Sequence, residues 1–168
     1  KYYSEKIIYM PHSYQCNDNT KKISKHNFSR RELGLFEKGF VFTCMNANYK
    51  IKPEEFNIWM RILLKIDNSV LWLYCSNKWA KENLKNEAKL RGVNPERLIF
   101  AEFMTIEKHL RRLTCGDLAL DTFNVNGHTT TSDAIWSGLP VLTLLGKSFT
   151  SRVSASLLTA IDVPELIT

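Results

Sequence analysis

The stretch Gly39–Cys75, "GFVFTCMNANYKIKPEEFNIWMRILLKIDNSVLWLYC", holds two short apolar runs separated by one longer amphipathic segment. The runs at 39–46 and 69–75 are nearly continuous in apolar residues, which is typical of buried strands. Between them, Pro53 opens a segment whose apolar residues recur at helical spacing, with two glutamates at its start that suit the helix dipole. A strand, a helix and a second strand in this order predict a right-handed βαβ unit with parallel strands.

The same alternation continues along the rest of the chain. Further strands are expected at 96–102, 117–121 and 139–146, and further helices at 77–92, 105–114, 128–138 and 149–161. We therefore predict the α/β class, with a Rossmann-like, doubly wound parallel sheet over residues 40–168. Residues 1–39 are expected to be a connection, with an N-terminal strand at "EKIIYMP" (5–11) and then a polar, lysine-rich loop.

Composition restricts the partners and the compartment. The 168 residues carry 23 Lys and Arg against 17 Asp and Glu, and this net charge of +6 favours an anionic ligand or a solvated basic surface. The four cysteines form no C-x-x-C pair, so we expect neither a disulfide framework nor a zinc site, and the pattern suits the cytoplasm. No apolar run reaches the roughly 18 residues of a membrane span, and we expect no membrane partner. The chain lacks an initiator Met, and we expect it to be a fragment of a longer protein.

Ligands of open parallel sheets bind beyond the carboxyl ends of the strands, so the strand-to-helix elbows are the candidate sites. The first elbow, 44–53, has neither G-x-G-x-x-G nor a Walker A motif, which argues against dinucleotide binding and P-loop hydrolysis. It places Lys50 just before a helix, where a lysine either holds a phosphate or faces solvent. In the second elbow, 75–83, Ser76 or Asn77 is expected only to cap a helix.

The elbow "NGHTTTSD", residues 126–133, has the most unusual composition. Gly127 suggests a turn with positive φ, and residues 128–130 then start a helix, so hydroxyls, unpaired N–H groups and the helix dipole converge. An over-supplied helix cap with several spare hydroxyls is one explanation, but one Ser or Thr would suffice for a cap, so the excess favours a phosphate site without a P-loop. Asp133 lies one turn further on, where a carboxylate would repel phosphate but accept hydrogen bonds from a ribose diol.

His109 and Arg112 lie three residues apart, on one face of the helix predicted after the third strand. An imidazole can stack on a base, and a guanidinium can donate to a base carbonyl. A solvated, charged helix face explains the same pair, so both interpretations stay open from these residues alone.

Several of these segments together resemble one protein family. The segments "NANYKIKPEEFNIWMRIL", "HLRR", "DLALDTFNVNGHTTTSDAIWSGLPVLT" and "SRVSASLL" follow, in order, the pattern of the O-GlcNAc transferases, glycosyltransferase family 41. The most specific part is G-H-T-T-x-x-D before W-x-G-x-P, and the chain looks closer to bacterial members than to the animal enzyme. The resemblance covers nearly the whole chain. It implies the C-terminal half of a GT-B glycosyltransferase, whose two Rossmann-like lobes enclose a nucleotide sugar.

The resemblance also implies a reaction and its site residues. Family members transfer N-acetylglucosamine from UDP-GlcNAc to Ser or Thr of an acceptor protein, with inversion at the anomeric carbon and without a metal or cofactor. By resemblance, Lys50 is the catalytic residue of this chain, because it binds the diphosphate and stabilises the UDP leaving group. The remaining donor-binding residues implied are His128, Thr129 and Thr130 for the phosphates, Asp133 for the ribose, and His109 and Arg112 for uracil.

The chain also departs from the family pattern. A glutamine that precedes the diphosphate lysine in the animal enzyme is Ala47 here, and a ribose-contacting lysine falls on Ile106. Lys108 lies one helical step away, and we do not assign it that role. The first lobe and the tetratricopeptide repeats that precede it in the family are missing, so we expect this chain alone to lack transferase activity. His12 is expected to be a packing or loop residue.

Two alternatives stay open. A relative with another sugar or acceptor, for example one that transfers glucose from UDP-glucose to Asn, would use the same elbows. A non-catalytic scaffold or nucleic-acid binder would use the charge of +6. The sequence offers no arginine and aromatic motif for nucleic acid, so we expect no such partner. The expected partners are UDP-GlcNAc or another UDP-sugar, an acceptor protein, and the missing lobe and repeats of the same parent chain.

Overall fold

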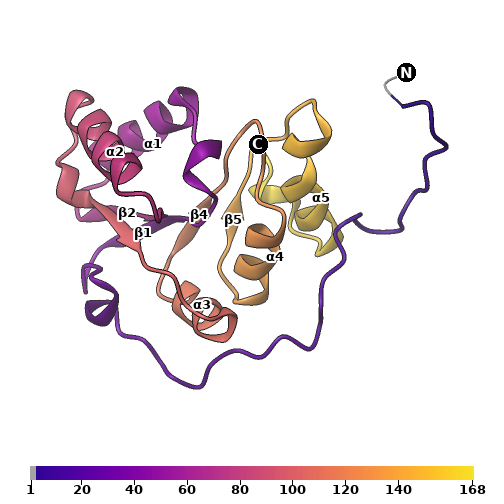
Figure 1. The fold of residues 1–168 in the computed structure, drawn as a ribbon, viewed down its shortest axis with the longest axis horizontal. Coiled ribbons are helices and arrows are strands. Elements are labelled where there is room, and N and C mark those ends of the chain that lie inside the picture. The colour runs from indigo at the N-terminus through magenta and orange to yellow at the C-terminus, as the bar shows by residue number, and fades with distance from the viewer. Residues whose placement is uncertain (1–2) are drawn as a thin grey trace.

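A computed structural model describes residues 3–168 of the chain. Its centre is one parallel sheet of five strands in the order β3-β2-β1-β4-β5 (Figure 1). The strands are β1 (Phe40–Cys44), β2 (Ser69–Tyr74), β3 (Leu98–Ala101), β4 (Leu118–Leu120) and β5 (Val141–Leu142). The predicted α/β class, the doubly wound parallel sheet and each strand predicted from position 39 onward are confirmed.

Helices cover both faces of this sheet. They are α1 (Pro53–Lys65), α2 (Lys78–Leu90), α3 (Ile106–Leu113), α4 (Thr129–Trp136) and α5 (Val153–Ala160). On one face, α1 and α2 build the largest core, in which Phe56 and Trp59 of α1 pack with Phe42 and Leu71 of the strands. Each such side chain contributes roughly 1.5–3 kcal/mol when it is removed from water. On the other face, residues of α3 and α4 pack against β5.

The strand order fixes where a ligand can bind. The chain adds β2 and β3 on one side of β1, then crosses through α3 and adds β4 and β5 on the other side. The loops after β1 and β4 therefore diverge to opposite faces, and a crevice opens between such loops at the carboxyl edge. Lys50 follows β1 and His128 follows β4, so both residues flank this topological switch point.

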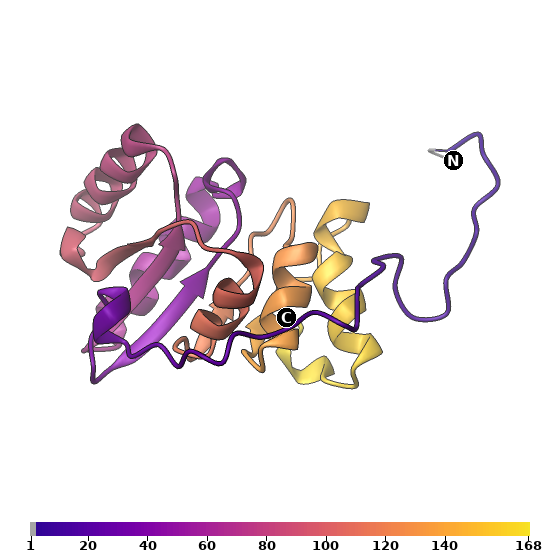
Figure 2. The same cartoon turned by 60° about the horizontal axis from the view of Figure 1, so that its bottom comes forward.

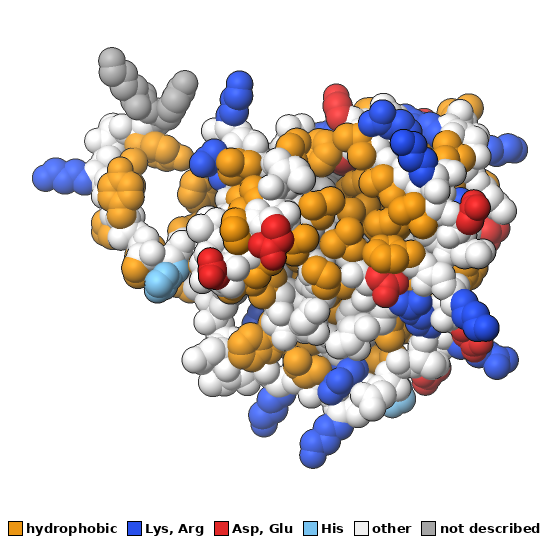
Figure 3. All heavy atoms as spheres, turned by 180° about the vertical axis from the view of Figure 1, so that it is seen from behind, with side chains coloured by type: hydrophobic (Ala, Val, Ile, Leu, Met, Phe, Trp, Pro, Cys, Tyr) orange, Lys and Arg blue, Asp and Glu red, His pale blue; other side chains and the backbone are white. Residues whose placement is uncertain are grey.

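The first part of the connection does not form the strand expected at 5–11. Between residues 3 and 39 the one regular element is the 3₁₀ turn η1 (Arg31–Leu33). Extended chain becomes a strand only when a neighbour completes its hydrogen-bond ladder. Ile8 and Tyr9 instead leave 85% and 87% of their surface exposed. Figure 3 shows this arm standing clear of the body, with its hydrophobic side chains outward.

The later part of the connection runs along the helices on the α3 and α4 side (Figures 1 and 2). The N–H of Ser24 donates to the carbonyl of Glu107 in α3 at 3.0 Å. The Arg30 guanidinium pairs with Asp117 at 2.7 Å, just before β4. The connection is therefore tied to the sheet lobe, while the division of the chain into residues 1–39 and 40–168 stays a prediction.

The structure shows which cysteines are buried and whether any helix could cross a membrane. Cys44, Cys75 and Cys115 are buried free thiols, and Cys16 is an exposed one. Burial raises the pKa of Cys44 to about 12, which keeps it protonated. Within residues 3–168, no helix has the length and apolar character required to cross a bilayer.

Candidate functional site

A buried carboxylate organises the carboxyl edge of the sheet. Asp121, directly after β4, is 4% exposed. Its oxygens accept hydrogen bonds from the Gly127 N–H at 2.7 Å, the Asn46 side-chain amide at 3.0 Å and the Thr143 hydroxyl at 2.8 Å. Burial raises the pKa of Asp121, and hydrogen bonds that include those from Gly127 and Thr143 oppose that shift. The loops after β1, β4 and β5 are thus held at one point.

Gly127 is needed here for space and not for a positive φ. Four glycines of the described chain have positive φ, and Gly127 is not among them, so the predicted turn conformation is wrong. A Cβ at this position would lie 2.4 Å from the Thr131 hydroxyl and 2.6 Å from the Thr130 hydroxyl. Asn46 Oδ1 would lie 3.0 Å away. The glycine therefore lets α4 start in contact with the β1 loop.

The three consecutive threonines differ in burial and in the hydrogen bonds of their hydroxyls. Thr131 is buried and its hydroxyl lies 2.8 Å from the Ser154 hydroxyl of α5. The Thr130 hydroxyl donates its proton to Asn46 Oδ1. Thr129 is exposed, and its hydroxyl makes no hydrogen bond within residues 3–168. Because a hydroxyl has one proton to donate, Thr129 keeps a donor for a ligand and Thr130 offers its backbone N–H.

Helix α4 starts without a cap. His128 is the N-cap residue, and no side chain of the described chain accepts from the first N–H groups. The simpler explanation of the threonines, an over-supplied cap, is therefore wrong. His128 Nδ1 lies 2.6 Å from the Tyr14 hydroxyl, and its Nε2 is buried without a hydrogen-bond partner among residues 3–168. Burial and then the charge of Lys50 lower the pKa of His128, so the ring is neutral at pH 7.

Lys50 reaches this elbow from the other side of the switch point. It ends the 3₁₀ turn η2 (Asn48–Lys50) between β1 and α1. Its ammonium donates to the carbonyl of Asn126 at 2.9 Å. A cation from the β1 loop therefore reaches the loop that carries the uncapped helix start and the unpartnered imidazole nitrogen, and such a set attracts an anion. The structure brings together the residues that the sequence placed on two separate elbows.

Arg112 is a buried residue, so the solvated-face interpretation does not hold for it. Its side chain is 2% exposed and its guanidinium stacks 5.7 Å over the Trp72 ring. It also donates to the carbonyl of Glu102 and, at 3.1 Å, to His109 Nδ1. Burial and then the Arg112 charge lower the pKa of His109 to about 4. His109 is therefore neutral at pH 7, with its position fixed by Arg112.

His109 and Arg112 line a cavity of about 320 Å³ at the same edge of the sheet. Its other walls include Met45 from the β1 loop and Phe103 and Met104 from the loop after β3. A largely apolar cavity with a neutral imidazole on its wall suits an aromatic ring such as a base. The structure thus places both residues predicted for the base, His109 and Arg112, on the wall of one cavity, with Arg112 also bonded to the His109 ring.

Asp133 meets a partner that sequence reasoning missed. Its carboxylate Oδ1 accepts from the ammonium of Lys21 at 2.6 Å, and the Asp133 side chain is 6% exposed. Lys21 belongs to the connection, as does Tyr14 beside His128. No local signal marks either residue, because each lies more than a hundred positions from its partner. A signal did exist for Asp121, since a carboxylate directly after an apolar strand needs buried donors.

Comparison with known proteins identifies the family. The profile of Glycosyl transferase family 41 matches residues 24–168. The chain belongs to this family. It is 37% identical, over 160 residues, to the probable UDP-N-acetylglucosamine--peptide N-acetylglucosaminyltransferase SEC of Arabidopsis thaliana, covering 92% of this chain and 16% of that protein. It is also 37% identical, over 139 residues, to the UDP-N-acetylglucosamine--peptide N-acetylglucosaminyltransferase of Caenorhabditis elegans, covering 83% of this chain and 12% of the relative.

A solved structure supports the same assignment of the family 41 chain. A lysine-to-methionine mutant of the Thermobaculum terrenum O-GlcNAc transferase superposes with a TM-score of 0.74 and 33% identity, over 77% of this chain and 26% of that one. The predicted family and glycosyltransferase class are therefore confirmed, as is the Rossmann-like half of a GT-B fold. The chain spans only 12% to 16% of the two sequence relatives.

Proposed function

We propose that this chain is the donor-binding lobe of a protein O-GlcNAc transferase, an inverting enzyme that needs no metal or cofactor. The donor is UDP-GlcNAc and the acceptor is a Ser or Thr hydroxyl of a protein. One observation carries the proposal: the Lys50 ammonium donates to the Asn126 carbonyl at 2.9 Å, which brings it to the loop that leads into the uncapped start of α4. The names of the relatives support UDP-N-acetylglucosamine as the donor and a peptide as the acceptor.

In the proposed arrangement the diphosphate lies against the α4 start. Lys50, the Thr129 hydroxyl and the N–H groups of Thr129 and Thr130 hold the phosphate oxygens, and His128 Nε2 adds a further contact. Uracil enters the cavity between His109 and Arg112, and Arg112 also holds the His109 imidazole in place. Asp133 accepts from the ribose diol. The support is geometric, because these groups come from α3, α4 and the β1 loop at one edge of the sheet.

The proposed chemistry uses the same groups at the leaving oxygen. The acceptor oxygen forms a bond to the anomeric carbon while the bond from that carbon to the β-phosphate oxygen breaks, and the proton of the acceptor hydroxyl is released to water. The electron pair goes to the phosphate, where negative charge grows. Lys50 and the α4 N–H groups are already oriented toward that charge, and preorganised donors of this kind stabilise a transition state strongly. The lobe acts together with a first lobe and repeats of the same parent chain, in the cytoplasm.

The test is calorimetric titration of UDP into the wild-type chain and a Thr129→Ala/Thr130→Ala variant. Thr159→Ala, on exposed surface of α5, is the matched control. We expect the double variant to bind UDP about tenfold more weakly, because a hydrogen bond to a charged group contributes roughly 1.5–3 kcal/mol. Circular dichroism shows that each variant is folded. Equal affinities of folded wild type and double variant contradict the proposed phosphate site.

A panel of nucleotide sugars tests the sugar within this proposal. We expect UDP-GlcNAc to bind more tightly than UDP-glucose. The reverse order would favour the relative that transfers another sugar or uses another acceptor. We expect no binding of a single-stranded oligonucleotide. Tight binding with a steep salt dependence would favour the scaffold alternative.

A further inference from the structure

We propose that Lys21, in the connection before the sheet, is a further nucleotide-binding residue that balances the charge of Asp133 and faces the donor. This inference rests on the proposed function, because it assigns a residue to the same UDP site. It also makes the connection a working part of that site, although it lies far from the elbows in the sequence.

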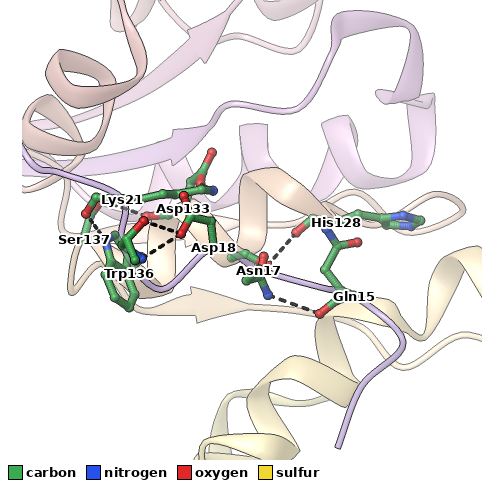
Figure 4. A network of polar contacts seen from close by, with 10 residues as sticks. Gln15, Asn17, Asp18, Lys21, His128, Asp133, Trp136 and Ser137 are labelled. Atoms are coloured by element: carbon green, nitrogen blue, oxygen red, sulfur yellow. Dashed lines mark hydrogen bonds and ion pairs between the residues drawn. The ribbon is translucent and has the colours of Figure 1, made fainter. Parts of the chain in front are cut away.

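The contact between Lys21 and Asp133 is close and largely shielded from water. The ammonium lies 2.6 Å from Asp133 Oδ1, and the two side chains are 21% and 6% exposed. The backbone carbonyl of Lys21 accepts from the Trp136 indole at 3.3 Å, one turn further along α4 (Figure 4). Backbone and side chain of Lys21 are thus both held against α4, which distinguishes it from a solvated surface lysine.

The connection is also fixed on the far side of Lys21. The Ser24 N–H donates to the Glu107 carbonyl at 3.0 Å, and the Arg111 guanidinium donates to the Ser24 carbonyl at 2.6 Å. Glu107 and Arg111 belong to α3, the helix that carries His109. The segment 21–24 therefore bridges α3 and α4, between the groups proposed for uracil and for ribose.

Charge explains why the site needs this lysine. Asp133 lies in the first turns of the helix whose start is proposed to hold a diphosphate, and a carboxylate there repels that anion. Lys21 cancels this repulsion and leaves Oδ2, which makes no hydrogen bond within residues 3–168, to accept from the ribose. An ammonium has three N–H donors, and Asp133 uses one of them. The remaining donors are available to the donor nucleotide.

The opposite role for Lys21 makes a different prediction. If its ammonium only occupied Asp133 until UDP displaced it, removing the ammonium would tighten UDP binding. If it belongs to the site, removal leaves a buried carboxylate without its partner and weakens binding. The sign of the change in UDP affinity therefore decides whether Lys21 binds the nucleotide or competes with it for Asp133.

The experiment is calorimetric titration of UDP into the wild-type chain, Lys21→Met and Lys22→Met. Lys22, the next residue, is exposed and serves as the matched control. We expect Lys21→Met to weaken UDP binding about tenfold, with a shallower salt dependence. Lys22→Met should bind as the wild type does, and Lys21→Arg, which keeps the charge, should stay within about threefold of the wild type.

Each outcome decides something. Unchanged or tighter UDP binding by folded Lys21→Met overturns this inference alone, whereas a folded wild type that does not bind UDP overturns the proposed function as well. If Lys21→Met does not fold, a Lys21→Met/Asp133→Asn variant, which has no unpaired buried charge, takes its place. It should bind UDP more weakly than Asp133→Asn, and equal affinity would overturn the inference.

Discussion

Helices α2 and α4 both start at the carboxyl edge of the sheet, but of the two only α2 is capped by the side chain of its N-cap residue. At α2, Asn77 accepts from the N–H groups of Trp79 and Ala80 at 2.9 and 3.2 Å. At α4, no side chain of the described residues caps the start, and Thr129 leaves its hydroxyl free. A cap contributes about 1 kcal/mol to stability. The α4 start lacks that contribution, and its N–H groups remain available to an anion.

The comparison separates two uses of one local motif. Polar groups at the start of a helix stabilise the fold when they hydrogen-bond to other groups of the chain. When they have no such hydrogen bonds, they can bind a ligand. The predictions below test whether the α4 start is a binding element and the α2 start a structural one.

The largest effect is expected for Lys50, which faces the open start. In a longer version of this protein that also carries a first lobe, Lys50→Ala should lower turnover about 10²- to 10³-fold, the loss typical for one preorganised donor. UDP affinity should change much less, because the charge on the phosphate grows in the transition state. Initial rates and UDP titration measure both. Lys38→Ala, at an exposed lysine, is the control, and near-normal turnover of Lys50→Ala would remove its catalytic assignment.

Asp121 should contribute to the stability of the loops that lead into the start of α4. Asp121→Ala leaves the Gly127 N–H, the Asn46 amide and the Thr143 hydroxyl without their buried acceptor. We expect a loss of about 3 kcal/mol in the free energy of unfolding, since each unsatisfied buried group costs roughly 1–3 kcal/mol. Urea unfolding measures it. A loss below about 1 kcal/mol would show that the loops are held without this carboxylate.

His109 should make stability depend on pH. Its pKa of about 4 in the folded chain lies below the ordinary value of 6.5, so the folded state excludes a proton that the unfolded state accepts. The stability of the wild type relative to His109→Gln should therefore fall as the pH falls from 6.5 to 4 and level off below. We expect the difference in the free energy of unfolding between the two proteins to change by about 2 kcal/mol, somewhat less than the full shift of the His109 pKa implies. Urea unfolding at several pH values measures it, and a constant difference would contradict a neutral, buried His109.

The smallest effects form a reciprocal pair that tests the comparison directly. Asn77→Ala should lower the free energy of unfolding by about 1 kcal/mol and leave UDP affinity unchanged. Thr129→Ala should leave stability unchanged and weaken UDP binding by about 1 kcal/mol or more. Thermal unfolding and calorimetry of both variants check the pair. A stability loss in Thr129→Ala equal to that of Asn77→Ala would show that both residues stabilise the start of their helix.

Local patterns predicted most of the fold. Each strand from β1 to β5 is a short apolar run, and α1 and α3 have apolar residues at helical spacing, so both signals are local in the sequence. The strand expected at 5–11 does not form for a physical reason: an apolar run forms a strand only beside a partner, and no segment of residues 3–168 pairs with it.

By itself, the sequence determined the parallel α/β sheet, the elbows that carry Lys50 and His128, and the likeness to family 41. These depend on backbone periodicity and on residues adjacent in the chain. Only the tertiary structure decided which hydroxyl of the threonine run stays free, that Arg112 is buried and bonded to His109, and that Lys21 pairs with Asp133. Such contacts join residues on different elements, and their free energies depend on distances and burial that the folded chain alone sets.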